Sequence, residues 1–234
     1  MQMQLYNSLL TSRKLAVVAI DTTGVTNKDV LLGITVAIVG CTDDSLQPPK
    51  YEEIARKTFF VRSSDTPDLS RSEPFNGISP QLYDAMADSP GAVRSEIVTY
   101  LHEHSPAVVL SYNIPFMDKY LIAGLALPLE HFATSVWDIT ALERLIRSKI
   151  AIASVRLVRD LAMYRHDAMH PENVRRSIEV AMDEVGGAPI DAVMQRHSIM
   201  TNRPDSVVGS AFRVHQCVEL LLKMLPETIT LDIK

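Results

Sequence analysis

Length, composition and charge exclude several classes of protein. The chain has 234 residues, of which 47% are hydrophobic and 22% charged, as in a globular protein that folds around a large core. Its two cysteines, Cys41 and Cys217, lie far apart, so the sequence predicts neither a disulfide framework nor a thiolate metal site, and a cytoplasmic location fits best. No apolar stretch reaches the roughly 20 residues that span a bilayer. The net charge of −5 argues against coating nucleic acid by bulk charge.

The first expected element is a strand at residues 15–21. Its unbroken apolar run, rich in β-branched residues, is typical of a strand covered on both faces. The strand ends on Asp21, followed by Thr22, Thr23 and Gly24. Open α/β sheets carry their functional groups at the carboxyl ends of strands, so Asp21 is a candidate site residue. Asp and Gly also favour the turn that leaves a strand, which gives the same residues a purely structural interpretation.

Two more strands are expected at residues 30–40 and 57–62, joined by a polar segment that contains two prolines. Short links favour an antiparallel meander of the three strands. The long connection at 62–82 follows, and connections of this length inside a domain are often functional. Helical patterns come next, at 80–87 and 91–103.

A strand, a polar turn and a helix are then predicted in direct succession. The apolar run at 107–111 leads into Tyr112 and Asn113, and Pro115 stands in the first turn of the following helix, where proline is tolerated. Asn113 and Asp118 are expected at the mouth of this turn. The arrangement resembles the one proposed around Asp21.

Helical patterns dominate the rest of the chain. Residues 136–140 are expected to begin a helix with Asp138 as its N-cap, and 154–163 predict another helix. A short helix is expected at 189–196. The apolar stripe of residues 206–225 predicts a long final helix.

Taken in order, these pieces resemble the DEDD-type 3'–5' exonucleases, the proofreading and RNase T group with an RNase H-like fold. The resemblance covers roughly residues 15–164 and 206–225. It is carried by five segments: DTTG at 21–24, FNGIS at 75–79, YNIPF at 112–116, WDITAL at 137–142 and VELLLKML at 218–225. It implies an α/β domain with a mixed five-stranded sheet, an antiparallel meander plus parallel strands, flanked by helices. Residues 1–234 would form a single exonuclease-like domain, with 165–205 as a helical insertion before the last helix.

The resemblance also implies a metal-dependent chemistry. In this family two divalent cations, Mg²⁺ or Mn²⁺, about 4 Å apart, activate a water and stabilise the leaving oxygen of a phosphodiester. Asp21 and Asp118 are the candidate metal ligands if the protein is active. With His215 they are the candidate catalytic residues.

The sequence departs from the family pattern at each motif. The first strand carries one carboxylate where the family has two. At the second motif Met117 stands at a ligand position, and Asp118 follows about 100° further around the helix, where it would point away. On the last helix Gly209 stands near the position of the family's His and Val214 at that of its Asp, with His215 one step further on. Losing several acids should weaken Mg²⁺ binding severely.

Candidate nucleic-acid contacts lie on both sides of the expected groove. Polar and aromatic side chains near the strand ends could meet a nucleic-acid end, and basic side chains on two adjacent helices could meet phosphates. Phe75 could stack on a base. The candidates near the strand ends are Thr22, Thr23, Tyr112 and Asn113, and the basic ones include Arg144 and Arg147.

Three hypotheses of function remain. The preferred one is a degenerate exonuclease domain, a pseudoenzyme that binds a nucleic-acid end or a partner from a replication or processing complex. The second is an active, diverged 3'–5' exonuclease that acts on single-stranded ends with Mg²⁺ or Mn²⁺. The third is a protein-interaction subunit that uses the insertion and never contacts nucleic acid. The choice of DNA or RNA, the partner and the formation of a homo-oligomer are left open by the sequence.

Overall fold

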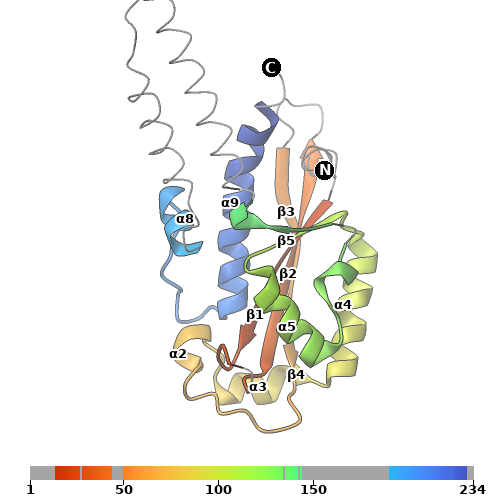
Figure 1. The fold of residues 1–234 in the computed structure, drawn as a ribbon, viewed down its shortest axis with the longest axis vertical. Coiled ribbons are helices and arrows are strands. Elements are labelled where there is room, and N and C mark those ends of the chain that lie inside the picture. The colour runs from red at the N-terminus through yellow and green to blue at the C-terminus, as the bar shows by residue number, and fades with distance from the viewer. Residues whose placement is uncertain are drawn as a thin grey trace, which may run out of the picture.

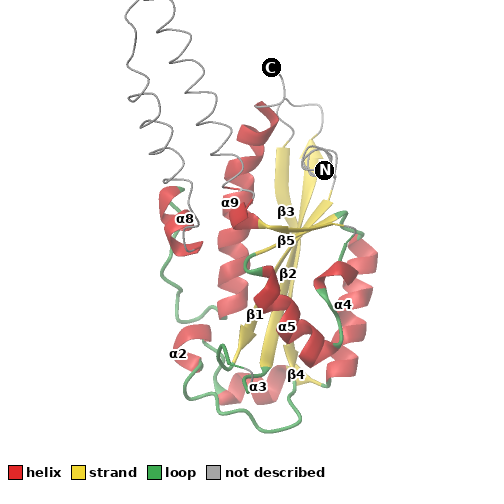
Figure 2. Cartoon of the chain, in the orientation of Figure 1, coloured by secondary structure: helices red, strands yellow, loops and turns green. Residues whose placement is uncertain are grey.

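The central element of the protein is a six-stranded sheet between two layers of helices (Figures 1 and 2). The computed structural model describes residues 14–26, 28–43, 50–133, 135–141, 143 and 190–230. The strand order is β4-β3-β2-β1-β5-β6. The strands are β1 (Lys14–Thr22), β2 (Leu31–Asp43), β3 (Lys50–Val61), β4 (Ala87–Asp88), β5 (Val108–Ser111) and β6 (Ser135–Asp138).

Strand directions make this a mixed sheet. β2 runs antiparallel to both of its neighbours, β1 and β3. β5 is parallel to β1, β6 to β5, and β4 to β3, so within the described sheet β2 alone runs against the others. The α/β class, the antiparallel meander and the parallel strands predicted from the sequence are therefore confirmed.

The predicted count of five strands was wrong, and two boundaries also differ. β3 begins at Lys50, seven residues before the expected start, because its first half is exposed and polar and therefore looks like a connection in the sequence. Residues 136–137 belong to β6 and not to a helix, as suits their β-branched and aromatic side chains. Asp138, at the end of β6, still caps the next helix: its Oδ1 accepts the amides of Thr140 at 2.8 Å and Ala141 at 3.2 Å.

Helices cover both faces of the sheet (Figure 1). α4 and α5 pack on one face, and α9, with the short α8 beside it, packs on the other. These elements match the predicted helices closely, including the short one before the last. The helices are α2 (Glu73–Asn76), α3 (Pro80–Met86), α4 (Pro90–His104), α5 (Ile114–Leu125), the 3₁₀ turn η1 (Leu129–His131), α8 (Ile190–Arg196) and α9 (Gly209–Thr230).

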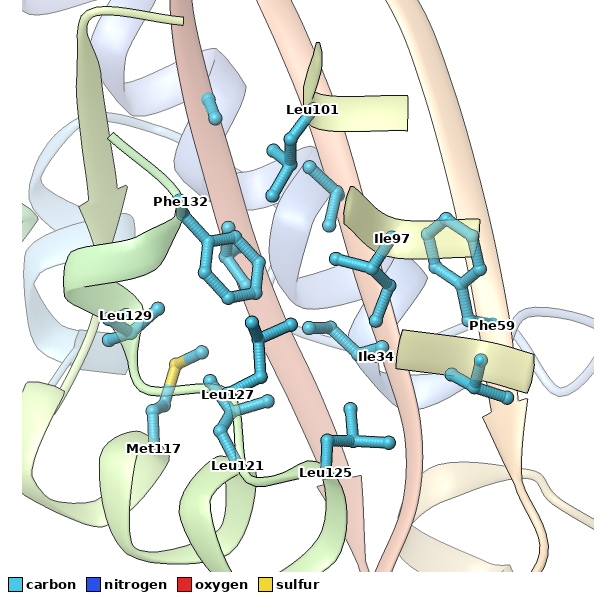
Figure 3. Packing of buried hydrophobic residues seen from close by; sticks show 14 of the residues in the cluster. Ile34, Phe59, Ile97, Leu101, Met117, Leu121, Leu125, Leu127, Leu129 and Phe132 are labelled. Carbon is cyan, nitrogen blue, oxygen red and sulfur yellow. The ribbon is translucent and has the colours of Figure 1, made fainter. Parts of the chain in front are cut away.

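The alternation of side chains along β1 divides the core. Leu15, Val17 and Ala19 face α8 and α9, whereas Ala16 and Val18 face α4 and α5. Because β1 is buried on both faces, it fixes the position of the residue at its end. Figure 3 shows the layer on the α4 and α5 side, which contains the labelled residues Ile34, Phe59, Ile97, Leu121 and Phe132.

Several predictions fall on residues outside the described ranges. They are the helix at 154–163, the part of the predicted insertion at 165–189, and Arg144 and Arg147. Both cysteines are free thiols. No helix in the described part of the chain is long and apolar enough to cross a bilayer.

Candidate functional site

A cleft of about 1090 Å³ opens at the carboxyl end of β1. Its walls come from the end of β1 and the loop after it, the connection between β3 and α2, α2 itself, the start of α5 and the first turns of α9. The end of β1, α2 and the start of α9 meet at this end of the molecule (Figure 1). The cleft therefore lies where the sequence placed the functional groups.

Asp21 lies in this cleft and is only 5% exposed. Its Oδ2 accepts a hydrogen bond of 2.9 Å from the backbone N–H of Ser210, the second residue of α9. A carboxylate at this place satisfies a helix amide that has no partner within the helix and interacts favourably with the helix dipole. Burial raises the pKa of Asp21 from 3.8 to about 6, although the hydrogen bonds from Ser210 and the charge of Arg203 act in the opposite direction.

Gly209, the first residue of α9, packs directly against Asp21. A Cβ atom at this position would lie 2.6 Å from Oδ1 of Asp21 and 3.0 Å from Cα of Asn76. Position 209, which the sequence alignment put near the family's histidine, therefore has no room for a side chain in this structure. The first turn of α9 closes over the Asp21 carboxylate.

Met117, which the sequence comparison with the exonuclease pattern aligned with an acid, is buried at the cleft. Its side chain is 3% exposed and lines the cleft, and Oγ of Ser111 donates to its sulfur at 2.5 Å. A thioether is a poor ligand for hard cations, which prefer oxygen. The neighbouring Asp118 does not line the cleft: its Oδ1 accepts the amide of Leu129 at 2.7 Å and so ties α5 to η1.

The structure does not bring the three predicted catalytic residues together. His215 lies on α9 outside the cleft lining, with its side chain 45% exposed and its Nε2 3.7 Å from Oε1 of Glu219. Among the residues that the structure describes, no group of three or more His, Cys, Asp or Glu side chains could hold a metal ion. Asp29, Asp65 and Asp68 also line the cleft, but they do not gather with Asp21 into such a group, and Asp21 itself caps a helix. This arrangement does not fit a centre of two cations.

The predicted nucleic-acid contacts are partly brought together. Thr22, Thr23 and Tyr112 line the cleft. One face of the Tyr112 ring is covered by the guanidinium of Arg213, 5.7 Å from the ring centroid. Asn113 does not line the cleft: it has a left-handed backbone with φ of 55°, and its N–H donates to Oδ2 of Asp138 at 3.1 Å.

Sequence reasoning named Phe75 at the rim of the cleft but missed Val25, Lys28 and Arg71. Val25 and Phe75 both line it and are 77% and 81% exposed, more than the other large hydrophobic residues that the structure describes. Lys28 and Arg71 are exposed cations that line it as well. The segment DTTG could have indicated Val25, because Val25 follows it directly.

Comparison with known proteins identifies structures of similar fold but no family. No family model and no curated protein matches the chain. A structure of the 3'-end specific recognition of histone mRNA stem-loop by 3'-exonuclease is similar, with a TM-score of 0.54 at 12% identity over 92% of this chain and 82% of that one. A full-length 3'-exonuclease is similar at a TM-score of 0.53 and 10% identity over the same shares of both chains. At these identities the likeness shows the fold alone: this chain shares the mixed α/β fold of those 3'-exonucleases.

Proposed function

We propose that the protein binds a single-stranded nucleic-acid end in this cleft and hydrolyses it little or not at all. The proposal depends on one observation: the first turn of α9 contacts the carboxylate of Asp21 directly. The carboxylate that the exonuclease pattern would assign to a cation accepts the amide of Ser210, and Gly209 fills the space beside it. The cleft is open, whereas Asp21 and Asp118, the two acids that the exonuclease pattern would use, accept backbone amides of Ser210 and Leu129.

The rim of the cleft supports nucleic-acid binding. Phe75 presents an exposed aromatic ring, and Val25 presents a second apolar surface in the same cleft. Stacking of one base on an aromatic side chain contributes about 1–3 kcal/mol. Only unpaired bases offer their faces freely, so an end with unpaired bases is the expected ligand. The 3'-exonuclease of similar fold is seen in 3'-end specific recognition of a histone mRNA stem-loop, which is consistent with a ligand that is a nucleic-acid end.

Binding is tested by fluorescence anisotropy with short labelled DNA and RNA oligonucleotides at several salt concentrations. Arg71→Ala should weaken binding and lower the salt dependence by about one released counterion, because it removes a cation from the cleft. Arg94→Ala is the matched control, since Arg94 is also exposed but lies on α4 and not in the cleft lining. Equal effects of the two substitutions would point to charge in general and contradict a specific site.

The aromatic contact has its own test. Phe75→Ala should lower the affinity by about tenfold or more, as expected for the loss of one stacked base. Met86→Ala serves as the control, because Met86 is 55% exposed and does not line the cleft. A wild-type protein that binds no oligonucleotide at low salt would overturn the proposal in favour of a protein-interaction subunit.

Hydrolysis is tested separately with 5'-labelled single strands in Mg²⁺ or Mn²⁺. We expect the strands to stay intact. A ladder of products shortened from the 3' end and abolished by Asp21→Asn would identify an active exonuclease. That result would refute the second half of the proposal and leave the first half standing.

A further inference from the structure

Arg203 joins two segments at the rim of the cleft. Its Nε donates to the carbonyl of Phe75 at 3.1 Å and its Nη2 to that of Pro74 at 3.3 Å. Its Nη1 donates to the carbonyls of Val207 at 2.6 Å and Pro204 at 3.2 Å. One guanidinium therefore fastens α2 to the segment that leads into α9.

The position of Phe75 depends on such a fastening. α2 has only four residues, too few for a stable helix on its own. The ring of Phe75 is 81% exposed, so packing of the ring does not hold it in place. Within the described contacts of α2, Asn76 adds a longer hydrogen bond, 3.4 Å from its Nδ2 to the carbonyl of Thr22.

The site is shaped for a guanidinium. Gly77 follows α2 with a φ of 69°, and a Cβ at this position would overlap Nη1 of Arg203. The absence of a side chain at Gly77 lets the planar group lie against the backbone. A lysine has the same charge but a single ammonium in place of the fork, so it cannot bond both segments in the same way.

We propose that Arg203 is a positioning residue, which holds the backbone of Phe75 at the place from which its ring meets a base. This inference rests on the proposed function for its ligand. Its geometric part, the immobilisation of Phe75, does not depend on that ligand. The effect of Arg203 on binding should therefore pass through Phe75 and through no other side chain of the rim.

A double-mutant cycle tests the coupling. Arg203→Lys should lower the affinity for a single-stranded oligonucleotide by about tenfold when Phe75 is present, the loss expected for one stacked base. In the Phe75→Ala background the same change should have less than about a twofold effect. Arg203→Lys combined with Val25→Ala is the control, and there the two effects should multiply. A loss that is equal with and without Phe75 would mean that Arg203 acts directly, and would overturn the inference.

A measurement without nucleic acid separates this inference from the proposed function. Trp137 is the single tryptophan, so Phe75→Trp in a Trp137→Phe background places one reporter at the rim. Arg203→Lys should then lower the fluorescence anisotropy of the reporter, while circular dichroism shows that the fold is kept. An unchanged anisotropy overturns the inference even if the wild type binds. Loss of anisotropy in a protein that binds no oligonucleotide overturns the proposed function alone.

Discussion

The contact between α9 and Asp21 can be tested by adding one methyl group at position 209. In Gly209→Ala the new Cβ would lie 2.6 Å from Oδ1 of Asp21 and 3.0 Å from Cα of Asn76. The second of these atoms belongs to the backbone and cannot rotate away. The first turn of α9 must therefore shift, and the hydrogen bond from Ser210 to Asp21 must lengthen.

The expected magnitude follows from two opposing effects. Alanine favours a helix over glycine by about 1 kcal/mol in the interior and by less at the first position. Overpacking a tight site costs about 1–3 kcal/mol, and weakening a hydrogen bond to a charged group adds to that cost. We expect a net loss of about 2 kcal/mol in the free energy of unfolding, which for a chain of this size lowers Tm by about 4–8 °C.

Urea denaturation and thermal unfolding measure this loss, and Gly91→Ala is the matched control. Gly91 lies in the first turn of α4, and a Cβ there would meet nothing within 4 Å. That variant should be as stable as the wild type or up to about 1 kcal/mol more stable. If Gly209→Ala behaved like Gly91→Ala, α9 would not be seated on Asp21, and the argument against hydrolysis would fail.

Two further predictions concern the same end of the sheet. The pKa of Asp21 rises from 3.8 to about 6 on folding, so the folded state binds the proton more tightly and the free energy of unfolding falls as the pH rises between these values. Asp21→Asn removes this titration. In denaturant titrations, the free energy of unfolding of this variant minus that of the wild type should therefore increase by up to about 3 kcal/mol from about pH 4 to about pH 7. A difference that stays constant with pH would contradict the burial of the carboxylate. Tyr120→Phe removes a hydroxyl that donates to the carbonyls of Thr26 at 2.7 Å and Gly24 at 3.3 Å. It should cost about 1 kcal/mol and speed amide exchange in residues 23–26, and unchanged exchange there would show that the loop is held by other contacts.

Local patterns in the sequence predicted most of the helices and strands. The apolar run of β1 predicts a strand buried on both faces, and its residues do alternate between the two core layers. Pro115 and the stripe of α9 predict a helix start and a long amphipathic helix, because both depend on neighbours within a few residues. These signals need no knowledge of the tertiary structure.

The missed strands lack such local signals. The first half of β3 is exposed and charged, and its pairing with β2 gives it a strand conformation that its own residues do not indicate. β4 has only two residues and exists through its pairing with Phe60 and Val61. β6 ends at Asp138, whose helix-capping signal is genuine but applies to the residues after it.

The sequence predicted where the candidate site lies, but not which distant residues contact one another there. Asp21 was found because strand ends carry functional groups, yet the amide that it accepts belongs to Ser210, 189 residues further along the chain. The same holds for Arg203, whose carbonyl partners in α2 lie 128 and 129 residues before it. Asp118 was a candidate ligand in the sequence, although helix geometry would turn it away, and its bond to Leu129 places it outside the cleft lining.

Each departure from the exonuclease pattern is fitted to its own surroundings in the fold. A histidine at position 209 would require α9 to withdraw from Asp21, which would leave the amide of Ser210 without its acceptor and a buried carboxylate without its donor. An acid in place of Met117 would put a charge where the side chain is 3% exposed and bonded to Ser111. Each change alone would destabilise the fold, so no single substitution rebuilds a catalytic centre. Phe75 and Val25 take no part in these contacts, because both side chains are exposed at the rim. Substitutions at Phe75 and Val25 can therefore test the proposed binding without disturbing the contacts around Asp21.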